Sequence, residues 1–239
     1  MSDTFCRNEF GQPVGFPLPT GWIPPALPTR SLIYGDHCRL EPLVPACHAE
    51  PLFAAHQAAD DRSSWTYLPY GPFTTMAEYQ QWMEASCERD DPLFFAIVDG
   101  KAARAVGVAS YLRITPVAGS IEVGHIHYTP RLRRTLAGTE AMYLLMKQAF
   151  AWGYRRYEWK CDALNGPSRT AAERLGFRFE GIHRQATICK GRNRDTAWYS
   201  ILDGEWPKLN AAFSRWLSPD NFDGTGRQRQ RLSQLTGAL

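Results

Sequence analysis

The chain has 239 residues, of which 44% are hydrophobic, so it can bury one full core with extensions at its ends. Its formal net charge of +3 comes from scattered lysines and arginines, which argues against the clustered basic stripe of a nucleic-acid-binding protein. The six cysteines lie far apart without a Cys-x-x-Cys pair, which argues against a metal site and a disulfide framework and favours a reducing cytoplasm.

Residues 1–30 form an arm that contains six prolines and therefore cannot be a helix. The arm has no apolar run long enough for a signal peptide or a membrane span. Its apolar anchors are Phe5, Phe10, Phe16 and Trp22. We expect them to hold the arm extended across the domain or against a neighbouring subunit, so a homodimer is one expected assembly.

Residues 31–203 carry the hydrophobic patterns of a folded domain. Residues 31–43 predict a first strand or a bent pair of strands, and residues 45–59 and 75–89 predict helices. Between these helices, residues 63–73 form a loop rich in aromatic side chains.

Strands and helices alternate in the rest of the domain. Three β-rich runs bounded by Asp-Gly and Pro-Val-Ala-Gly turn signals predict an antiparallel meander at residues 93–98, 105–114 and 121–128. The further expected elements are a helix at 138–152, a strand at 156–162, a short helix at 165–175, strands at 177–182 and 197–202, and a C-terminal helix within 204–217. Residues 218–239 are polar and predict a poorly ordered tail.

The segment from Asn165 to Gly181 predicts a short capped helix that leads directly into a strand. Asn165 can accept from the first free helical N–H groups, Pro167 suits the first turn, and Gly176 supplies the positive φ that ends the helix. The segment contains, in order, Asn-x-x-Ser, Ala, Leu-Gly-Phe and Glu-Gly, and Tyr-Glu-Trp-Lys-Cys-Asp precedes it at residues 157–162. This order resembles the GNAT superfamily of acyl-CoA-dependent N-acetyltransferases, and within it the ribosomal-protein N-terminal acetyltransferases of the RimJ/RimL type.

The resemblance covers roughly residues 30–203 and implies an α/β (α+β) fold. In that fold a mixed, mostly antiparallel twisted sheet is flanked by helices and splays open between its fourth and fifth strands. Acetyl-CoA, the implied acyl donor, would bind in the wedge, and no metal is implied. The implied activity is transfer of an acetyl group to a primary amine of a small molecule or of a peptide or protein N-terminus.

The resemblance places the pyrophosphate cradle in the loop that leads into the helix at 138–152. Helix N-termini bind phosphates through free N–H groups and the positive end of the helix dipole. The residues at this place are Arg133, Arg134, Thr135, Leu136, Ala137, Gly138 and Thr139, of which Arg133 and Gly138 match the family's loop pattern. Leu136 departs from the family pattern, which has a glycine there, and the two adjacent arginines could offset this by pairing with phosphate oxygens.

The resemblance also implies roles on the acyl-donor side of the site. Backbone N–H groups near His127 to Thr129, with Tyr128 and Thr129 as the candidates, would bind the thioester carbonyl. Asn165 would contact the pantetheine arm, and Ser168 would protonate the departing thiolate. The alternative for Ser168 is that its hydroxyl only bonds a helix N–H.

The base that deprotonates the amine is assigned to Glu122, because related enzymes often carry a carboxylate on the fourth strand. His125 and His127 are the alternatives, since the unperturbed pKa of histidine suits this task. Period-two alternation places both histidines on the opposite face of the strand from Glu122.

The loop after the first helix walls the acceptor pocket in this superfamily. Trp65, Tyr67 and Tyr70, together with Phe73, are therefore the candidate substrate-binding residues. Packing in the core is the alternative for these side chains.

Two departures from the family keep other classes of function open. Leu136 replaces a glycine, and Thr187 stands where RimL-like proteins carry a further glutamate. The chain could therefore be a catalytically degenerate acyl-CoA-binding or interaction module. A structural partner that assembles through its proline-rich arm is the third alternative.

Overall fold

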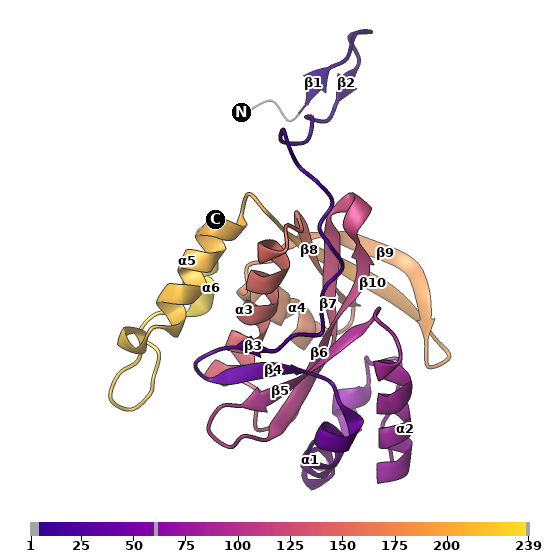
Figure 1. The fold of residues 1–239 in the computed structure, drawn as a ribbon, viewed down its shortest axis with the longest axis vertical. Coiled ribbons are helices and arrows are strands. Elements are labelled where there is room, and N and C mark those ends of the chain that lie inside the picture. Colours follow the sequence, from indigo (N-terminus) through magenta and orange to yellow (C-terminus); the bar gives the residue numbers. More distant parts are fainter. Residues whose placement is uncertain (1–4, 60–61, 238–239) are drawn as a thin grey trace.

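Eight strands form one twisted sheet in the computed structural model, which describes residues 5–59 and 62–237 (Figure 1). In spatial order they are β3 (Ile33–Tyr34), β4 (Cys38–Pro42), β5 (Leu93–Asp99), β6 (Ala105–Thr115), β7 (Ser120–Tyr128), β8 (Arg156–Asp162), β10 (Arg192–Leu202) and β9 (Arg178–Cys189). Neighbouring strands run antiparallel except for β7 and β8, which run parallel. The mixed, mostly antiparallel sheet predicted from the sequence is therefore confirmed.

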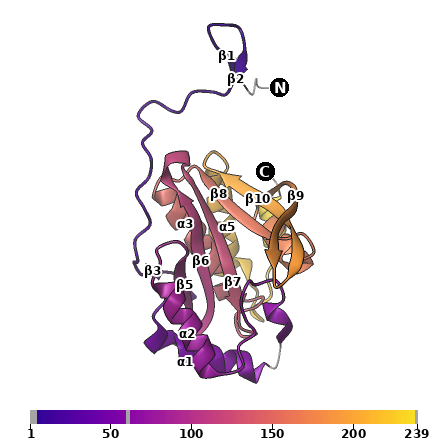
Figure 2. The same cartoon turned by 90° about the vertical axis from the view of Figure 1, so that its right-hand side faces the viewer.

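Helices cover both faces of this sheet (Figures 1 and 2). One face carries α1 (Pro45–Ala58) and α2 (Met76–Cys87), and the other carries α3 (Leu136–Ala151), α4 (Gly166–Arg174), α5 (Trp206–Leu217) and α6 (Leu232–Thr236). In β5, Phe95 and Ile97 pack into the core beneath α3, whereas Phe94 and Val98 pack into the core beneath α1 and α2. A strand buried on both faces needs apolar residues throughout, so the sequence of β5 does not alternate.

The central helix α3 is buried on nearly all sides because α5 covers its outer surface. The rings of Tyr143 and Phe213 stack with their centroids 5.2 Å apart, and those of Phe150 and Trp206 stack at 4.9 Å. Within the described residues, no helix is both long enough and apolar enough to cross a membrane.

The segment after α5 differs from the poorly ordered tail that its polar sequence predicts. It returns through the short turn Pro219–Asn221 and ends in α6, where Leu232 is 1% exposed. The Asn221 amide donates to the carbonyls of Trp216 and Gln230 and accepts the Gln230 N–H at 2.9 Å. Polar side chains thus fix a segment that lacks a long apolar run. Residues 238–239 lie outside the described part of the chain.

The N-terminal arm lies partly on the domain and partly away from it (Figure 2). Ala26 anchors it, because its carbonyl accepts from the Tyr154 hydroxyl at 3.2 Å, and Trp22 lies against the turn before β7. Before Trp22 the chain projects from the body as a small hairpin, β1 (Cys6–Arg7) and β2 (Pro13–Val14). Three predicted anchors in this part remain exposed: Phe5, Phe10 and Phe16. Residues 1–4 lie outside the described part.

The β9–β10 hairpin is longer than predicted. Its strands continue to Cys189 and resume at Arg192, around a turn in which Lys190 and Gly191 have positive φ. Most of the residues added to β9 are exposed, so they do not show the apolar alternation that identifies a strand in a sequence.

Glu140 of α3 anchors the first hairpin of the sheet. Its buried carboxylate accepts the backbone N–H groups of Asp36, His37 and Cys38 at 2.9, 2.7 and 2.8 Å. Gly35 has to be glycine, because a Cβ there would lie 2.6 Å from the Glu140 carboxylate. Three backbone donors therefore depend on one side chain.

Replacing Glu140 with glutamine should destabilise the fold. The glutamine has one acceptor oxygen, and its amide N–H₂ would face a backbone donor, so the free energy of unfolding should fall by about 2–3 kcal/mol. Urea unfolding would measure the loss. Glu50→Gln, at an exposed position of α1, is the control and should stay within about 0.5 kcal/mol of the wild type. Equal midpoints for the two variants would contradict the anchoring role.

Candidate active site

The parallel strands β7 and β8 separate partway along their length. They pair from Ser120 with Arg156 to Val123 with Trp159, and beyond these residues the ladder of β7 continues with β6. We call the place where β7 and β8 are no longer paired the opening. If β3 and β4 are counted together as the bent first strand, β7 and β8 are the fourth and fifth strands, so the opening corresponds to the predicted splay. Because parallel strands end at the same edge of a sheet, α3 and α4 both begin beside the opening.

Charged side chains fill the point where the two strands part. Glu122 and Glu158 lie opposite each other in the strand register, and the Lys160 ammonium lies 3.0 and 2.7 Å from their carboxylates. Lys160 is almost fully buried, and its Nζ lies 3.7 Å from the centroid of the Trp198 ring. Arg113 adds a second cation, with its Nη1 at 2.8 and 2.7 Å from the two Glu122 oxygens. The cations offset the repulsion between two adjacent carboxylates.

The Glu122 carboxylate is therefore buried and held by two cations. Burial raises the pKa of Glu122 above the ordinary glutamate value, and the opposing charges of Lys160 and Arg113 do not cancel this rise. A raised pKa makes the carboxylate a better proton acceptor. Both of its oxygens already bond to cations, so an ammonium group would have to reach it through water or by displacing one of them.

His127 lies on the same face of the sheet as Glu122, and the predicted opposite placement is wrong. Glu122 pairs with Leu112 and His127 pairs with Val108. These partners share a face of β6 because they are separated by an even number of residues. The odd separation on β7 comes from a β-bulge at His125, whose φ is 50°. The ring of His125 also lies on this face, where it contacts Phe94 beneath α2.

The histidines near the opening pack among aromatic rings. His127 stacks on His56 with centroids 4.0 Å apart, and its Nε2 lies 3.0 Å from the Ser64 hydroxyl. His125 Nδ1 lies 3.2 Å from the Tyr70 hydroxyl. Burial, aided by nearby arginines, lowers the pKa of His56 and His125 to about 4. Both rings are therefore neutral at pH 7, and such a low pKa makes them weak bases.

The loop before α3 has the geometry of an anion site. Thr135 caps the helix by accepting the Gly138 N–H at 3.0 Å, so the helix begins at Leu136 rather than at residue 138 as predicted. The N–H groups of Leu136 and Ala137 lie in the first turn, where no intrahelical acceptor reaches them. The Leu136 side chain packs against the core, which accounts for a leucine in place of the family's glycine.

Several residues predicted for this cradle make internal contacts. Thr139 is buried, and its hydroxyl donates to the Thr135 carbonyl. Gly138 has no space for a Cβ, which would lie 2.5 Å from a backbone oxygen. Arg133 donates from Nε to the Tyr128 carbonyl at 3.2 Å. The groups placed to meet a phosphate are the first-turn N–H groups and the exposed side chain of Arg134.

At the end of β7, successive N–H groups point to opposite sides. Thr129 donates its N–H and its hydroxyl to the Val106 carbonyl of β6, at 3.1 and 2.6 Å. Tyr128, one residue earlier, therefore directs its N–H away from β6 and toward the opening. Of the two predicted positions, Tyr128 is placed to bind a thioester carbonyl, whereas Thr129 anchors the strand.

Asn165 and Ser168 lie at the start of α4. Asn165 caps the helix by accepting the Ser168 N–H at 3.1 Å, as predicted. The Ser168 hydroxyl instead accepts from the Trp159 indole N–H at 3.0 Å. Burial raises the pKa of the Cys161 thiol, and a hydrogen bond from Ser168 opposes that rise. The single proton of the Ser168 hydroxyl therefore points to the Cys161 thiol, and a departing thiolate would have to compete with that thiol for it.

The loop between α1 and α2 lies over the opening. The Tyr67 hydroxyl donates to the Leu164 carbonyl at 3.2 Å, and the Lys190 ammonium, at the tip of the β9–β10 hairpin, donates to the Trp65 carbonyl at 2.7 Å. The Trp65 ring is only 5% exposed and Tyr70 packs in the same aromatic cluster, whereas Tyr67 remains exposed. Of the three predicted substrate-binding residues, Tyr67 is the one whose ring remains accessible.

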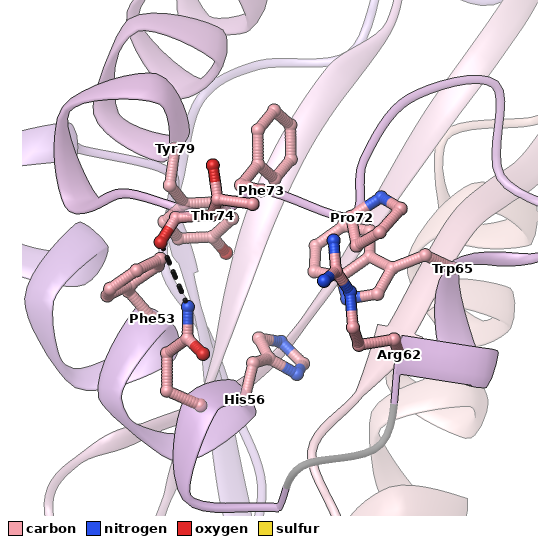
Figure 3. A pocket seen from close by; sticks show the side chains of 9 residues that line it. Phe53, His56, Arg62, Trp65, Pro72, Phe73, Thr74 and Tyr79 are labelled. Carbon is pink, nitrogen blue, oxygen red and sulfur yellow. Dashed lines mark hydrogen bonds between the residues drawn. The ribbon is translucent and has the colours of Figure 1, made fainter.

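A cavity of about 190 Å³ lies beneath this loop, between α1 and α2 (Figure 3). It is lined by Phe53, His56, Gln57, Arg62, Trp65, Pro72, Phe73, Thr74 and Tyr79. His56 links this cavity to the opening through its stacking contact with His127.

The partners of the predicted residues carry weaker signals in the sequence. Lys160 lies in the middle of the predicted strand at 156–162, and a lysine in a buried strand is a signal that could have identified it. Arg113 and His56 reach the site through strand register and helix packing, and they carry no comparable sequence signal.

Known proteins share this fold. The family model for an acetyltransferase (GNAT) domain matches residues 37–178. The solved structure of a GCN5-related N-acetyltransferase from Brucella melitensis is 46% identical, has a TM-score of 0.88, and aligns over 91% of this chain and 99% of that chain. A probable GNAT-family acetyltransferase from Chromobacterium violaceum is 40% identical, with a TM-score of 0.76 over 81% of this chain and 97% of that chain. No curated protein sequence matches the chain.

A more distant structural match is RimL, described as a ribosomal L7/L12 alpha-N-protein acetyltransferase. It is 21% identical, with a TM-score of 0.61 over 76% of this chain and 99% of that chain, which shows a shared fold. The family model spans more than half of the chain and includes both strands of the opening and the loop before α3. The chain therefore belongs to the GNAT family of N-acetyltransferases.

Proposed function

We propose that this protein transfers the acetyl group of acetyl-CoA to a primary amine of a small molecule or of a peptide N-terminus. The observation that carries the proposal is the opening between β7 and β8, beside which α3 and α4 both begin. An extended thioester in this opening would have its phosphates near α3 and its sulfur near α4.

The donor side offers groups that fit acetyl-CoA. Arg134 and the first-turn N–H groups of α3 would bind the pyrophosphate, where the helix dipole favours negative charge. The Tyr128 N–H would bind the thioester carbonyl, and Asn165 would contact the pantetheine arm. Ser168 would donate its proton to the thiolate that leaves.

On the acceptor side, Glu122 would take the proton of the ammonium group through water. His127 remains the alternative base, because it lies on the same face of β7. Tyr67 would contact the acceptor from the loop that lies over the opening. The covering loop and hairpin favour a small amine or a short peptide end over a folded protein surface.

Acetyl-CoA should raise the melting temperature of the protein, because it binds the folded state alone.

Arg134→Ala should weaken acetyl-CoA binding by about tenfold, since it removes a cation from the phosphate site. Leu136→Gly should not tighten binding, because the leucine side chain packs into the core. Thermal shift and calorimetry would measure these effects.

A missing thermal shift at millimolar acetyl-CoA would contradict the proposed function. Binding without turnover, in a thiol-release assay against a panel of amines and N-terminal peptides, would instead indicate an acyl-CoA-binding module.

Glu122→Gln should lower kcat/KM by about 10²–10⁴ and remove the acid limb of its pH profile. The base works only as a carboxylate, so wild-type activity should fall as the pH drops through the pKa of Glu122. Because that pKa is raised, the limb should lie above the ordinary glutamate range. Acetyl-CoA affinity should be retained.

Glu158→Gln is the matched control, because Glu158 shares Lys160 with Glu122. It should lower stability and leave the acid limb in place. An unchanged limb in Glu122→Gln would transfer the role of base to His127.

Ser168→Ala should lower kcat per folded molecule while acetyl-CoA affinity stays the same. The substitution also removes the acceptor of the Trp159 N–H, which should cost about 1 kcal/mol of stability. Single-turnover kinetics and urea unfolding would separate the two effects. Ser86→Ala, which breaks a hydroxyl bond to the Trp82 carbonyl within α2, is the control for hydroxyl loss and should leave kcat alone. An unchanged kcat in Ser168→Ala would remove this residue from the chemistry.

A further inference from the structure

Arg194 lies on β10, just beyond the part of that strand that pairs with β8. The pairing of β10 with β8 begins at Thr196, which lies opposite Asp162, two residues after Arg194. Arg194, Thr196 and Trp198 alternate along the strand, so their side chains share one face of the sheet. Lys160 lies over the Trp198 ring, on the same face. Arg194 is therefore on the face that carries the charged cluster at the opening.

The Arg194 guanidinium makes no ion pair within the part of the chain that the structure describes, and its buried Nε has no hydrogen-bond partner there. Neighbouring arginines do have acceptors, since Arg113 bonds to Glu122 and Arg169 donates to the Tyr199 hydroxyl at 3.0 Å. A buried guanidinium N–H without an acceptor is costly. A bound ligand could supply the acceptor.

The charge of Arg194 reaches both edges of the opening. On β7, burial is the main cause that lowers the pKa of His125, and the charges of Arg113 and Arg194 lower it further. On β8, burial raises the pKa of Cys161, whereas Ser168 and then Arg194 oppose that rise. The guanidinium thus lies close enough to act on side chains from both strands.

The end of the opening near Arg194 is covered rather than open. Lys190, in the turn of the same hairpin, bonds to the Trp65 carbonyl, and Tyr67 bonds to the Leu164 carbonyl in the loop before α4. Electrostatic interactions are stronger in a site from which water is partly excluded. An ionic contact with Arg194 would therefore contribute more than one on an open surface.

We infer that Arg194 binds an anionic group of the acceptor, a carboxylate or a phosphate, that lies close to the amine to be acetylated. The inference rests on the proposed function and narrows its substrates to amines that carry such a group. A planar guanidinium can donate to two oxygens of either anion at once. This bidentate contact would orient the amine toward the thioester at the end of β7.

Matched pairs of acceptors test the inference: O-phosphoethanolamine against ethanolamine for a phosphate, and glycylglycine against glycylglycinamide for a carboxylate. The wild type should favour the anionic member of at least one pair by about ten- to a hundredfold in kcat/KM. Arg194→Gln should remove this preference through KM and leave the neutral member and the acetyl-CoA Kd within about twofold. Arg194→Lys keeps the charge without the planar fork and should retain part of the preference.

Arg192→Gln is the matched control, because Arg192 is the exposed preceding residue on the same face of β10. This variant should keep the full preference. The inference is overturned if the wild type shows no preference in either pair, or if Arg194→Gln impairs charged and neutral acceptors equally. It is also overturned if Arg194→Gln acts by weakening acetyl-CoA binding.

Failure of the proposed function has a different signature, since no acceptor would then be acetylated, whether or not acetyl-CoA binds. In that case calorimetric titration of O-phosphoethanolamine and glycylglycine still tests the anion site. Binding of either compound by the wild type and its loss in Arg194→Gln would support the site. Equal binding by both proteins, or no binding by the wild type, would overturn it.

Discussion

A buried lysine at the point where two parallel strands part is the contact on which the site depends. Lys160 bonds to Glu122 and Glu158, which the strand register places opposite each other. Two buried carboxylates this close stay ionised only if a cation neutralises them. The lysine therefore allows β7 and β8 to pair up to this position. Beyond it their paired register ends, so the same three side chains mark the start of the opening.

The donor side of the site follows from the direction of these strands. Because β7 and β8 run parallel, they bring the starts of α3 and α4 to one edge of the sheet. Thr135 and Asn165 cap the two helices, each accepting one N–H. Other first-turn N–H groups remain for a ligand. Two segments far apart in the sequence thus form one surface, which under the proposed function would bind the phosphates and the thiol of the donor.

Features with a local cause could be predicted from the sequence, whereas features set by strand register could not. The Asn165 cap and the strands of the meander depend on short segments, and the structure agrees with them. The arrangement of the sheet was expected from the family resemblance instead. The bulge at His125 inserts one residue without a sequence signal, yet it moves His127 to the other face. The order of the C-terminal segment was also not predicted. No apolar run holds this segment; Asn221 and one buried leucine, Leu232, hold it instead.

The acceptor side is the part that sequence patterns describe least, and the structure explains why. In the proposed function it consists of the α1–α2 loop, the bulged end of β7 and the β9–β10 hairpin, which meet through contacts such as Lys190 with the Trp65 carbonyl. The hairpin is exposed along most of β9, so its residues are free of the packing constraints that shape the core. Arg194 lies on this hairpin. If the proposal holds, changes there would alter which amine is accepted without disturbing the caps and strand ends that would bind the donor.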